Sequence, residues 1–128
     1  MKYVAVGIAG MVGASLRYLI GLSFQHVWLY DFPFATFSTN MVGCFLLGWF
    51  TLLLPRLKFL PPVMIPALGT GLIGSFTTFS TFSVETVELM INSKWGIALL
   101  YILLSLWGGL LFLWLGYRFG SSKGETST

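Results

Sequence analysis

The stretch GSFTTFSTFSVET, residues 74–86, is the part of the sequence whose residue types could do chemistry. It places hydroxyl groups beside two aromatic rings, Phe79 and Phe82, which stand three residues apart and so share one face of a helix. An aromatic ring is negative on its face and positive on its edge, so a ring presented edge-on offers weak electropositive contact to an anion. The alternative is ordinary packing or lipid contact, which the spacing alone favours.

Two other segments carry pairs of hydrogen-bond donors at helical spacing. Thr36 and Asn40 stand four residues apart, and so do Tyr101 and Ser105. Such side chains donate without carrying a charge, which suits a path where a small anion must bind well enough to enter and weakly enough to leave. Hydrogen bonds between helices explain the same pairs equally well.

Three ionisable residues fall inside apolar segments, where a charge costs about 2.5–3.5 kcal/mol at a helix centre. Arg17 lies close enough to the end of its segment to extend its guanidinium toward the membrane surface. Glu85 and Glu88 share a helical face, and Glu88 is near enough to the end to be hydrated. Glu85 is deeper in the segment. The sequence favours equally that it faces a polar interior and that it does not.

Membrane-spanning helices must position these groups. The chain has 128 residues, of which 56% are hydrophobic and only 9% charged, too few charges to solvate a globular surface. About 20 apolar residues cross the ~30 Å hydrocarbon layer as a helix. We therefore predict an all-α integral membrane protein with four transmembrane helices, at residues 3–22, 36–54, 62–91 and 95–117.

The short connections leave no room for a soluble domain. We expect one membrane domain over residues 1–119 and a mobile tail over residues 120–128, which is rich in Ser, Gly and Thr. No stripe of basic residues indicates nucleic-acid binding. Small residues on three spans predict close helix packing, and a chain of this size encloses little alone, so we expect an oligomer.

The third span cannot be one uniform helix. Gly69, Gly71 and Gly74 weaken it, and the Ser and Thr residues after them compete for backbone hydrogen bonds, so we predict a break near residues 74–78. Non-helical backbone at membrane depth must be buried in protein or line an aqueous cavity. The break therefore faces inward, where it frees carbonyl oxygens that could hold a cation and starts a half-helix whose N-terminus favours an anion.

Basic residues lie mostly on one side of the predicted membrane. Five of them share the side of the N-terminus, namely Lys2, Arg56, Lys58, Arg118 and Lys123, while Lys94 faces the other side. The positive-inside rule then favours both termini in the cytoplasm.

The sequence closely resembles one family, the Fluc or CrcB fluoride channels. The resemblance covers nearly the whole chain and is carried by four features: GASLRY (13–18), STNMVG (38–43), GSFTTFSTFSVET (74–86), and Tyr101 with Ser105. It implies four-helix subunits that pair antiparallel into dual-topology dimers, with two fluoride pores and one central sodium ion. It also implies a multi-pass protein of the cell (plasma) membrane, the inner membrane of a bacterium, that passively exports fluoride and confers fluoride resistance. No catalytic constellation is expected, because passive conduction needs none.

The resemblance also implies roles for individual residues. By motif position, the ring edges of Phe79 and Phe82 contact fluoride, and Asn40 is the pore asparagine. The backbone carbonyls of Gly74 and Thr77, from both subunits, coordinate sodium. The remaining positions of the fluoride pathway are a polar track of Thr36, Tyr101 and Ser105, an arginine near the vestibule at Arg17, and the glutamate of the FS-x-ET segment at Glu85.

Two positions depart from the family pattern. Ser75 stands where many members have a second Gly, and Gly109 stands where some carry another serine of the track. The orientation preferred by the basic residues also differs from the near-zero bias of a dual-topology homodimer. The partner is therefore an identical antiparallel chain or, as the alternative, an inverted paralogue in a heterodimer.

Two other functions remain open at this point. A proton-coupled small multidrug exporter would also have four spans, but it needs a carboxylate in the first span, where this chain has Arg17 and no acid. A pH gradient alone would drive transport by such an exporter. The other possibility is a subunit that does not conduct by itself, which fluoride efflux by the purified chain would distinguish from a self-sufficient channel.

Overall fold

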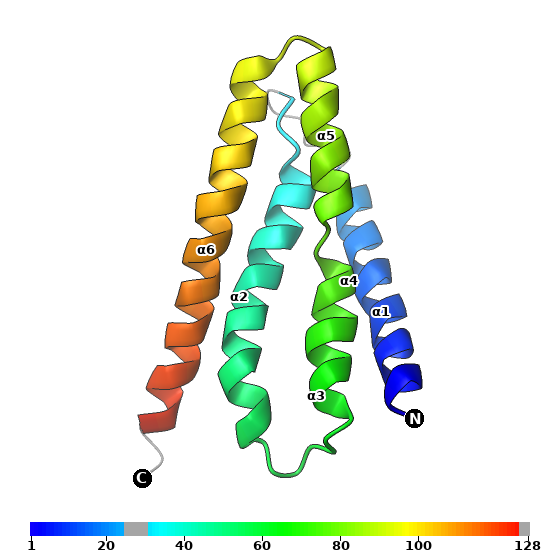
Figure 1. Ribbon diagram of the computed structural model, residues 1–128, viewed down its shortest axis with the longest axis vertical. Helices are drawn as coiled ribbons and strands as arrows, with labels where there is room; N and C mark the ends of the chain where they lie inside the picture. The colour runs from blue at the N-terminus through cyan, green and yellow to red at the C-terminus, as the bar shows by residue number, and fades with distance from the viewer. Residues whose placement is uncertain (25–30, 126–128) are drawn as a thin grey trace.

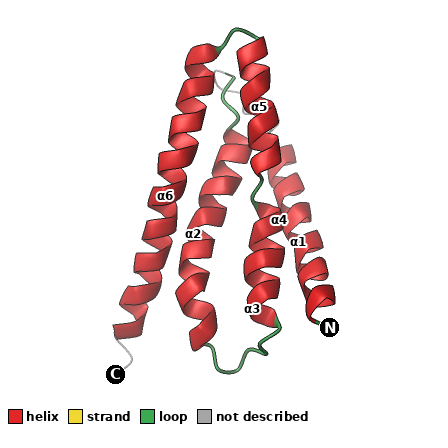
Figure 2. Cartoon of the chain, in the orientation of Figure 1, coloured by secondary structure: helices red, strands yellow, loops and turns green. Residues whose placement is uncertain are grey.

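The computed structural model describes residues 1–24 and 31–125, and this part of the chain is helical without strands (Figures 1 and 2). Three helices are long and apolar enough to cross a membrane: α1 (Lys2–Ser23), α2 (Phe34–Arg56) and α6 (Trp95–Glu125, apolar over Trp95–Ser122). The remaining segment, which is third in chain order and which we call the interrupted rod, is broken into shorter helices. It consists of α3 (Met64–Pro66), η1 (Ala67–Ile73), α4 (Gly74–Phe76) and α5 (Phe79–Ile91).

The rods run side by side as a bundle, with the N-terminus and the end of α6 at the same end (Figure 1). Helix α2 packs mainly against α6, and α1 packs mainly against η1 and α4. The predicted all-α class is confirmed, and the interrupted rod agrees with the predicted broken third span. The dimer and its topology stay predictions.

Glycines allow the closest helix contacts. A Cβ atom at Gly48 would collide with the carbonyl oxygen of Leu113, and one at Gly116 would collide with that of Phe45, so α2 and α6 approach through reciprocal glycine contacts. Gly13 meets the carbonyl of Leu72 in the same way where α1 crosses η1. Close backbone approach through small residues is how helices associate in lipid.

Helix α6 continues past the predicted end of the fourth span at residue 117, and the boundary predicted at residues 119–120 falls inside it. Its extension lies against α2: a Cβ atom at Gly120 would sit 3.3 Å from Trp49, and Arg56 Nη1 donates to the Gly120 carbonyl at 2.9 Å. Contact with α2 thus accompanies a helical conformation in residues 120–125, whose composition alone indicated a tail. Residues 126–128 lie outside the described residues, and the domain division stays a prediction.

A cluster of buried apolar residues sits at the end where α5 and α6 are joined. It contains Phe32, Leu89, Ala98 and Tyr101, with Phe82 among the partly buried residues packed against it. Most other large apolar side chains are exposed on the outside of the bundle, which is the surface that lipid covers.

Candidate functional site

The break in the interrupted rod consists of two extended residues, Thr77 (φ −79°, ψ 156°) and Thr78 (φ −149°, ψ 120°). The Thr78 side chain caps α5, because its hydroxyl oxygen accepts a hydrogen bond from the backbone N–H of Thr81 at 3.2 Å. Such a cap satisfies one of the N–H groups that a helix start leaves without a partner. The interruption falls within residues 74–78, where the sequence predicted it.

Helix α2 holds this interruption with two residues on one face. The Asn40 side chain accepts from the Thr78 backbone N–H at 2.8 Å and donates to the Thr78 carbonyl at 3.1 Å. Three residues along the helix, Gly43 faces Thr77, and a Cβ atom at Gly43 would collide with the Thr77 methyl group. Rotation of that methyl would cost a hydrogen bond, since the Thr77 hydroxyl donates to the Ile73 carbonyl at 3.0 Å.

A cavity of about 510 Å³ opens beside the interruption, and we call it the break cavity. It lies between α2, the interrupted rod and α6, and its lining includes Cys44 of α2. Six of the predicted site residues line it together: Asn40, Gly74, Thr77, Phe79, Phe82 and Ser105. Residues far apart in the sequence thus meet at the broken helix.

The two phenylalanines of the motif differ in their surroundings. Their ring centroids are 5.7 Å apart. Phe82 packs on Tyr101, with centroids 5.0 Å apart, whereas Phe79 is 79% exposed. An exposed aromatic ring beside a polar interruption is available to an ion or to a second protein surface, and Phe82 is held in place by the core.

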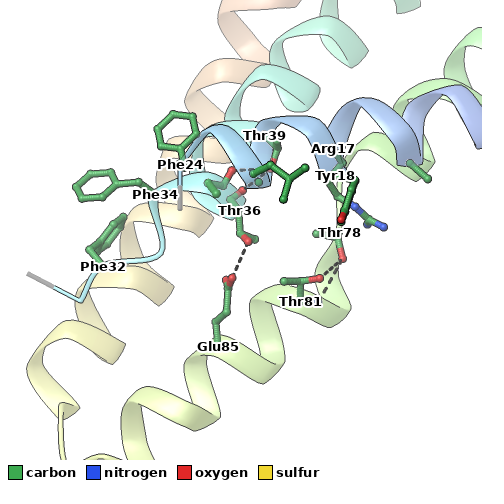
Figure 3. Close-up of a pocket in the computed structure, with 14 residues that line it drawn as sticks. Arg17, Tyr18, Phe24, Phe32, Phe34, Thr36, Thr39, Thr78, Thr81 and Glu85 are labelled. Carbon is green, nitrogen blue, oxygen red and sulfur yellow. Dashed lines mark hydrogen bonds between the residues drawn. The ribbon is translucent and has the colours of Figure 1, made fainter. Parts of the chain in front are cut away.

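A second cavity, of about 380 Å³, lies between α1, α2 and α5, and we call it the arginine cavity (Figure 3). Arg17 and Glu85 both line it, together with Thr36, Thr78 and Thr81. Arg17 therefore borders a space shared with polar groups of two other helices. Thr78 lines both cavities, so the interruption lies between them.

The Glu85 carboxylate joins three helices. One oxygen accepts from the Thr36 hydroxyl at 2.8 Å, and the other accepts from the Tyr101 hydroxyl at 2.8 Å. Tyr101 itself is fully buried, while Glu85 also lines a third cavity of about 190 Å³ with Glu88 and Lys94. Of the two environments weighed for Glu85, the structure places it in the polar one.

Sequence spacing did not reveal these partnerships. It paired Thr36 with Asn40 and Tyr101 with Ser105 along their own helices, but the structure bonds Thr36 and Tyr101 to Glu85 and bonds Asn40 to the interruption. The one available signal was Glu85 itself, because a carboxylate inside a membrane needs donors.

The carbonyls of Gly74 and Thr77 are the ones predicted to hold sodium, and their surroundings fit that role. Both residues line the break cavity, and apart from its chain neighbours and its own helix backbone no atom lies within 4 Å of a Cβ placed at Gly74. Oxygen ligands from unwound backbone suit a hard monovalent cation in membrane proteins. Among the described residues, no group of three His, Cys, Asp or Glu side chains could hold a metal ion instead.

Comparison with known sequences identifies the family. A family model described as "CrcB-like protein, Camphor Resistance (CrcB)" matches residues 4–117. The chain belongs to the CrcB family. Among its CrcB relatives is a protein of Bacillus cereus named fluoride-specific ion channel FluC 1, which is 52% identical over 92% of this chain and 82% of the relative.

Other CrcB relatives carry the same description. Proteins named fluoride-specific ion channel FluC 2 are 50% identical in Geobacillus kaustophilus, over 91% of both chains, and 42% identical in Listeria innocua, over 94% of this chain and 92% of the relative. With several helices able to cross a membrane, this CrcB protein is a multi-pass membrane protein. The roles of its individual site residues stay predictions.

Proposed function

We propose that this protein is a fluoride-selective channel and not an enzyme. The observation that carries the proposal is the meeting of Asn40, Ser105 and the Phe79–Phe82 pair around the break cavity, in a chain whose relatives are named fluoride-specific ion channels. Uncharged donors and ring edges bind a small anion without trapping it. Asn40 can serve in this role while holding the interruption, because its amide has two N–H groups and only one donates to Thr78.

The conducting unit in this proposal is an antiparallel, dual-topology dimer with one structural sodium ion. Two features support a second chain: Phe79 is 79% exposed beside the break cavity, and one chain offers only two of the carbonyls predicted to bind sodium. A symmetric partner would cover the exposed ring and double the number of carbonyls. The bound cation would supply positive charge close to the anion path.

Conduction is passive in this proposal, and its direction follows from acid chemistry. Neutral HF crosses the membrane from an acidic medium, ionises at the near-neutral internal pH and accumulates as fluoride. A selective channel lets fluoride leave down its own gradient without an energy source, which gives fluoride resistance. The proposed location is the plasma membrane.

The partner is an identical chain or an inverted paralogue. The basic residues of the described chain favour one orientation. Lys2 begins α1, Arg56 ends α2, Lys58 follows it and Arg118 lies near the end of α6, and these helix ends share the end of the bundle that holds the N-terminus (Figure 1). At the other end, Lys94 is paired with Asp31. Fluoride efflux from liposomes containing only this chain tests the homodimer. Absence of efflux that is restored by adding an inverted paralogue supports the heterodimer.

The proposed function is tested by fluoride efflux from proteoliposomes containing wild type, Phe79→Ile, Phe82→Ile and a control, Phe59→Ile. Phe59 is 78% exposed, which matches the exposure of Phe79, but it lies in the loop between α2 and α3. We expect fluoride efflux to fall at least tenfold in both motif variants, a change of about 1.4 kcal/mol in barrier height, and to persist in the control.

Two results contradict this proposal. If Phe79→Ile and Phe82→Ile assemble as the wild type does and conduct at the wild-type rate, the rings do not contact the ion. If the wild type with its partner passes chloride as readily as fluoride, the site is not selective for fluoride.

A further inference from the structure

The two carbonyls predicted to bind sodium share a property of the hydrogen-bonding pattern. In a continuous α-helix, each carbonyl accepts from the N–H four residues later. The carbonyl of Gly74 would therefore accept from Thr78, and that of Thr77 would accept from Thr81. Here both N–H groups donate to side chains instead: Thr78 N–H to the Asn40 side-chain oxygen at 2.8 Å, and Thr81 N–H to the Thr78 hydroxyl at 3.2 Å.

The hydrogen bond immediately before the interruption still follows the α-helical pattern. The Thr77 N–H still donates to the Ile73 carbonyl at 3.0 Å, and the Thr77 hydroxyl adds a second bond to the same oxygen at 3.0 Å. The change of partner thus begins at Thr78, where Asn40 supplies the acceptor. Since Asn40 also donates to the Thr78 carbonyl at 3.1 Å, it binds both polar backbone groups of this residue.

We propose that the side chains of Asn40 and Thr78 are positioning residues for a cation. By taking the N–H groups of Thr78 and Thr81, they keep the carbonyls of Gly74 and Thr77 available to sodium and prevent the interrupted rod from closing into a continuous helix. This inference rests on the proposed function, because it concerns the sodium ion of the proposed channel, and it gives Asn40 a task separate from contact with fluoride.

Energetics favour a dedicated side chain at each of these N–H groups. A backbone N–H left without a partner inside a protein costs about 1–3 kcal/mol, so an interruption with two such groups would tend to close unless the groups were paired. Water cannot fully replace these partners, because Thr78 is buried and Asn40 is partly buried in the α2 face against it. Sodium then adds favourable contacts only in the open form, and its binding stabilises that form.

The test measures how sodium alone stabilises the purified protein, by its melting temperature in detergent as sodium replaces N-methylglucamine. Fluoride is left out, and gel filtration checks assembly. The variants are Asn40→Ala and Thr78→Val, which remove the acceptors. Their controls are Thr78→Ser, which keeps the hydroxyl, and Cys44→Ala, which alters the lining of the break cavity one turn from Asn40.

We expect sodium to raise the melting temperature of the wild type, of Thr78→Ser and of Cys44→Ala with similar midpoints. We expect Asn40→Ala and Thr78→Val to need roughly tenfold more sodium, since each loses one hydrogen bond that keeps a carbonyl available, and such a bond changes an equilibrium by up to about tenfold. If Asn40→Ala does not assemble, the comparison of Thr78→Val with Thr78→Ser decides the matter, because these two side chains differ from threonine by one group each.

The inference is overturned if the two acceptor-removing variants keep the wild-type midpoint, or if sodium has no effect on the wild type. Fluoride efflux from the same preparations separates this failure from failure of the proposed function. If the wild type conducts fluoride but its melting temperature does not change with sodium, the proposed channel function stands and the proposed cation site is refuted. If the protein passes no fluoride but sodium raises its melting temperature in a way that depends on Asn40, the cation site stands and the proposed channel function is refuted.

Discussion

Removal of the Tyr101 hydroxyl tests whether Glu85 joins the helices as the structure has it. In Tyr101→Phe the ring stays, packed on Phe82 and on Phe32 with centroids 5.0 and 5.4 Å away, so little volume is lost. What disappears is one hydrogen bond to the Glu85 carboxylate, 2.8 Å long. The perturbation therefore isolates a single polar contact between α5 and α6.

The size of the effect follows from two limits. Hydrogen bonds to charged groups contribute about 1.5–3 kcal/mol in proteins, and the largest measured between membrane helices reach about 1.7 kcal/mol. The hydroxyl is fully buried, but Glu85 lines the arginine cavity and the third cavity, from which water can replace part of the lost bond. We expect Tyr101→Phe to destabilise the protein by about 1.5 kcal/mol, roughly tenfold in the unfolding equilibrium. 

The assay is reversible denaturation in mixed micelles, with Tyr117→Phe as the control. Tyr117 lies on the same helix but is 50% exposed, so its variant should stay within about 0.5 kcal/mol of the wild type. Because Thr36 donates to the other oxygen of Glu85, Thr36→Val and Tyr101→Phe should also give a non-additive double variant. Equal stability of Tyr101→Phe and Tyr117→Phe, with additive effects in the double variant, would refute the bridge through Glu85.

Two glycine variants test the close contacts of α2. Gly43→Ala should lower both fluoride efflux and melting temperature, because the new methyl group would displace Thr77 at the interruption. Gly48→Ala should cost about 1–3 kcal/mol in the same denaturation assay, since its methyl group collides with the backbone carbonyl of Leu113. Gly96→Ala is the control for both: nothing lies within 4 Å of its Cβ, so stability should be unchanged or higher by up to about 1 kcal/mol. If Gly43→Ala or Gly48→Ala has the same melting temperature as Gly96→Ala, the corresponding close contact with Thr77 or Leu113 is contradicted.

The membrane spans could be predicted from the sequence because they depend on composition and length alone. The second span, predicted at residues 36–54, lies within α2 (Phe34–Arg56), and the interruption at Thr77 and Thr78 falls within the predicted 74–78. Apolar runs and helix-weakening residues are local signals that require no knowledge of partners. The end of the fourth span was less accessible to such signals: α6 continues to Glu125, past the predicted residue 117, and contacts α2 through the hydrogen bond from Arg56 to Gly120.

The partners of the site residues could not be predicted in the same way. Spacing along one helix places Asn40 on a face with Thr36, but it does not say which backbone that face meets. The double hydrogen bond from Asn40 to Thr78 and the bridge from Thr36 to Glu85 join residues 38 and 49 positions apart. Such contacts depend on how helices pack, and the family resemblance supplied residue roles without supplying these bonds.

The same few polar residues hold the helices together and line the cavities, and the solvent explains why. In lipid, apolar side chains gain little by moving from hydrocarbon into protein, so helices are fixed by close glycine contacts and by hydrogen bonds. A path for an ion needs polar groups at the same depth, and those groups are tolerated only when they have partners. Asn40 and Glu85 satisfy both demands, since each bonds another segment and lines a cavity. A loss of fluoride efflux at either residue therefore identifies an ion contact only when the bonds to Thr78 or Tyr101 are shown to survive the substitution.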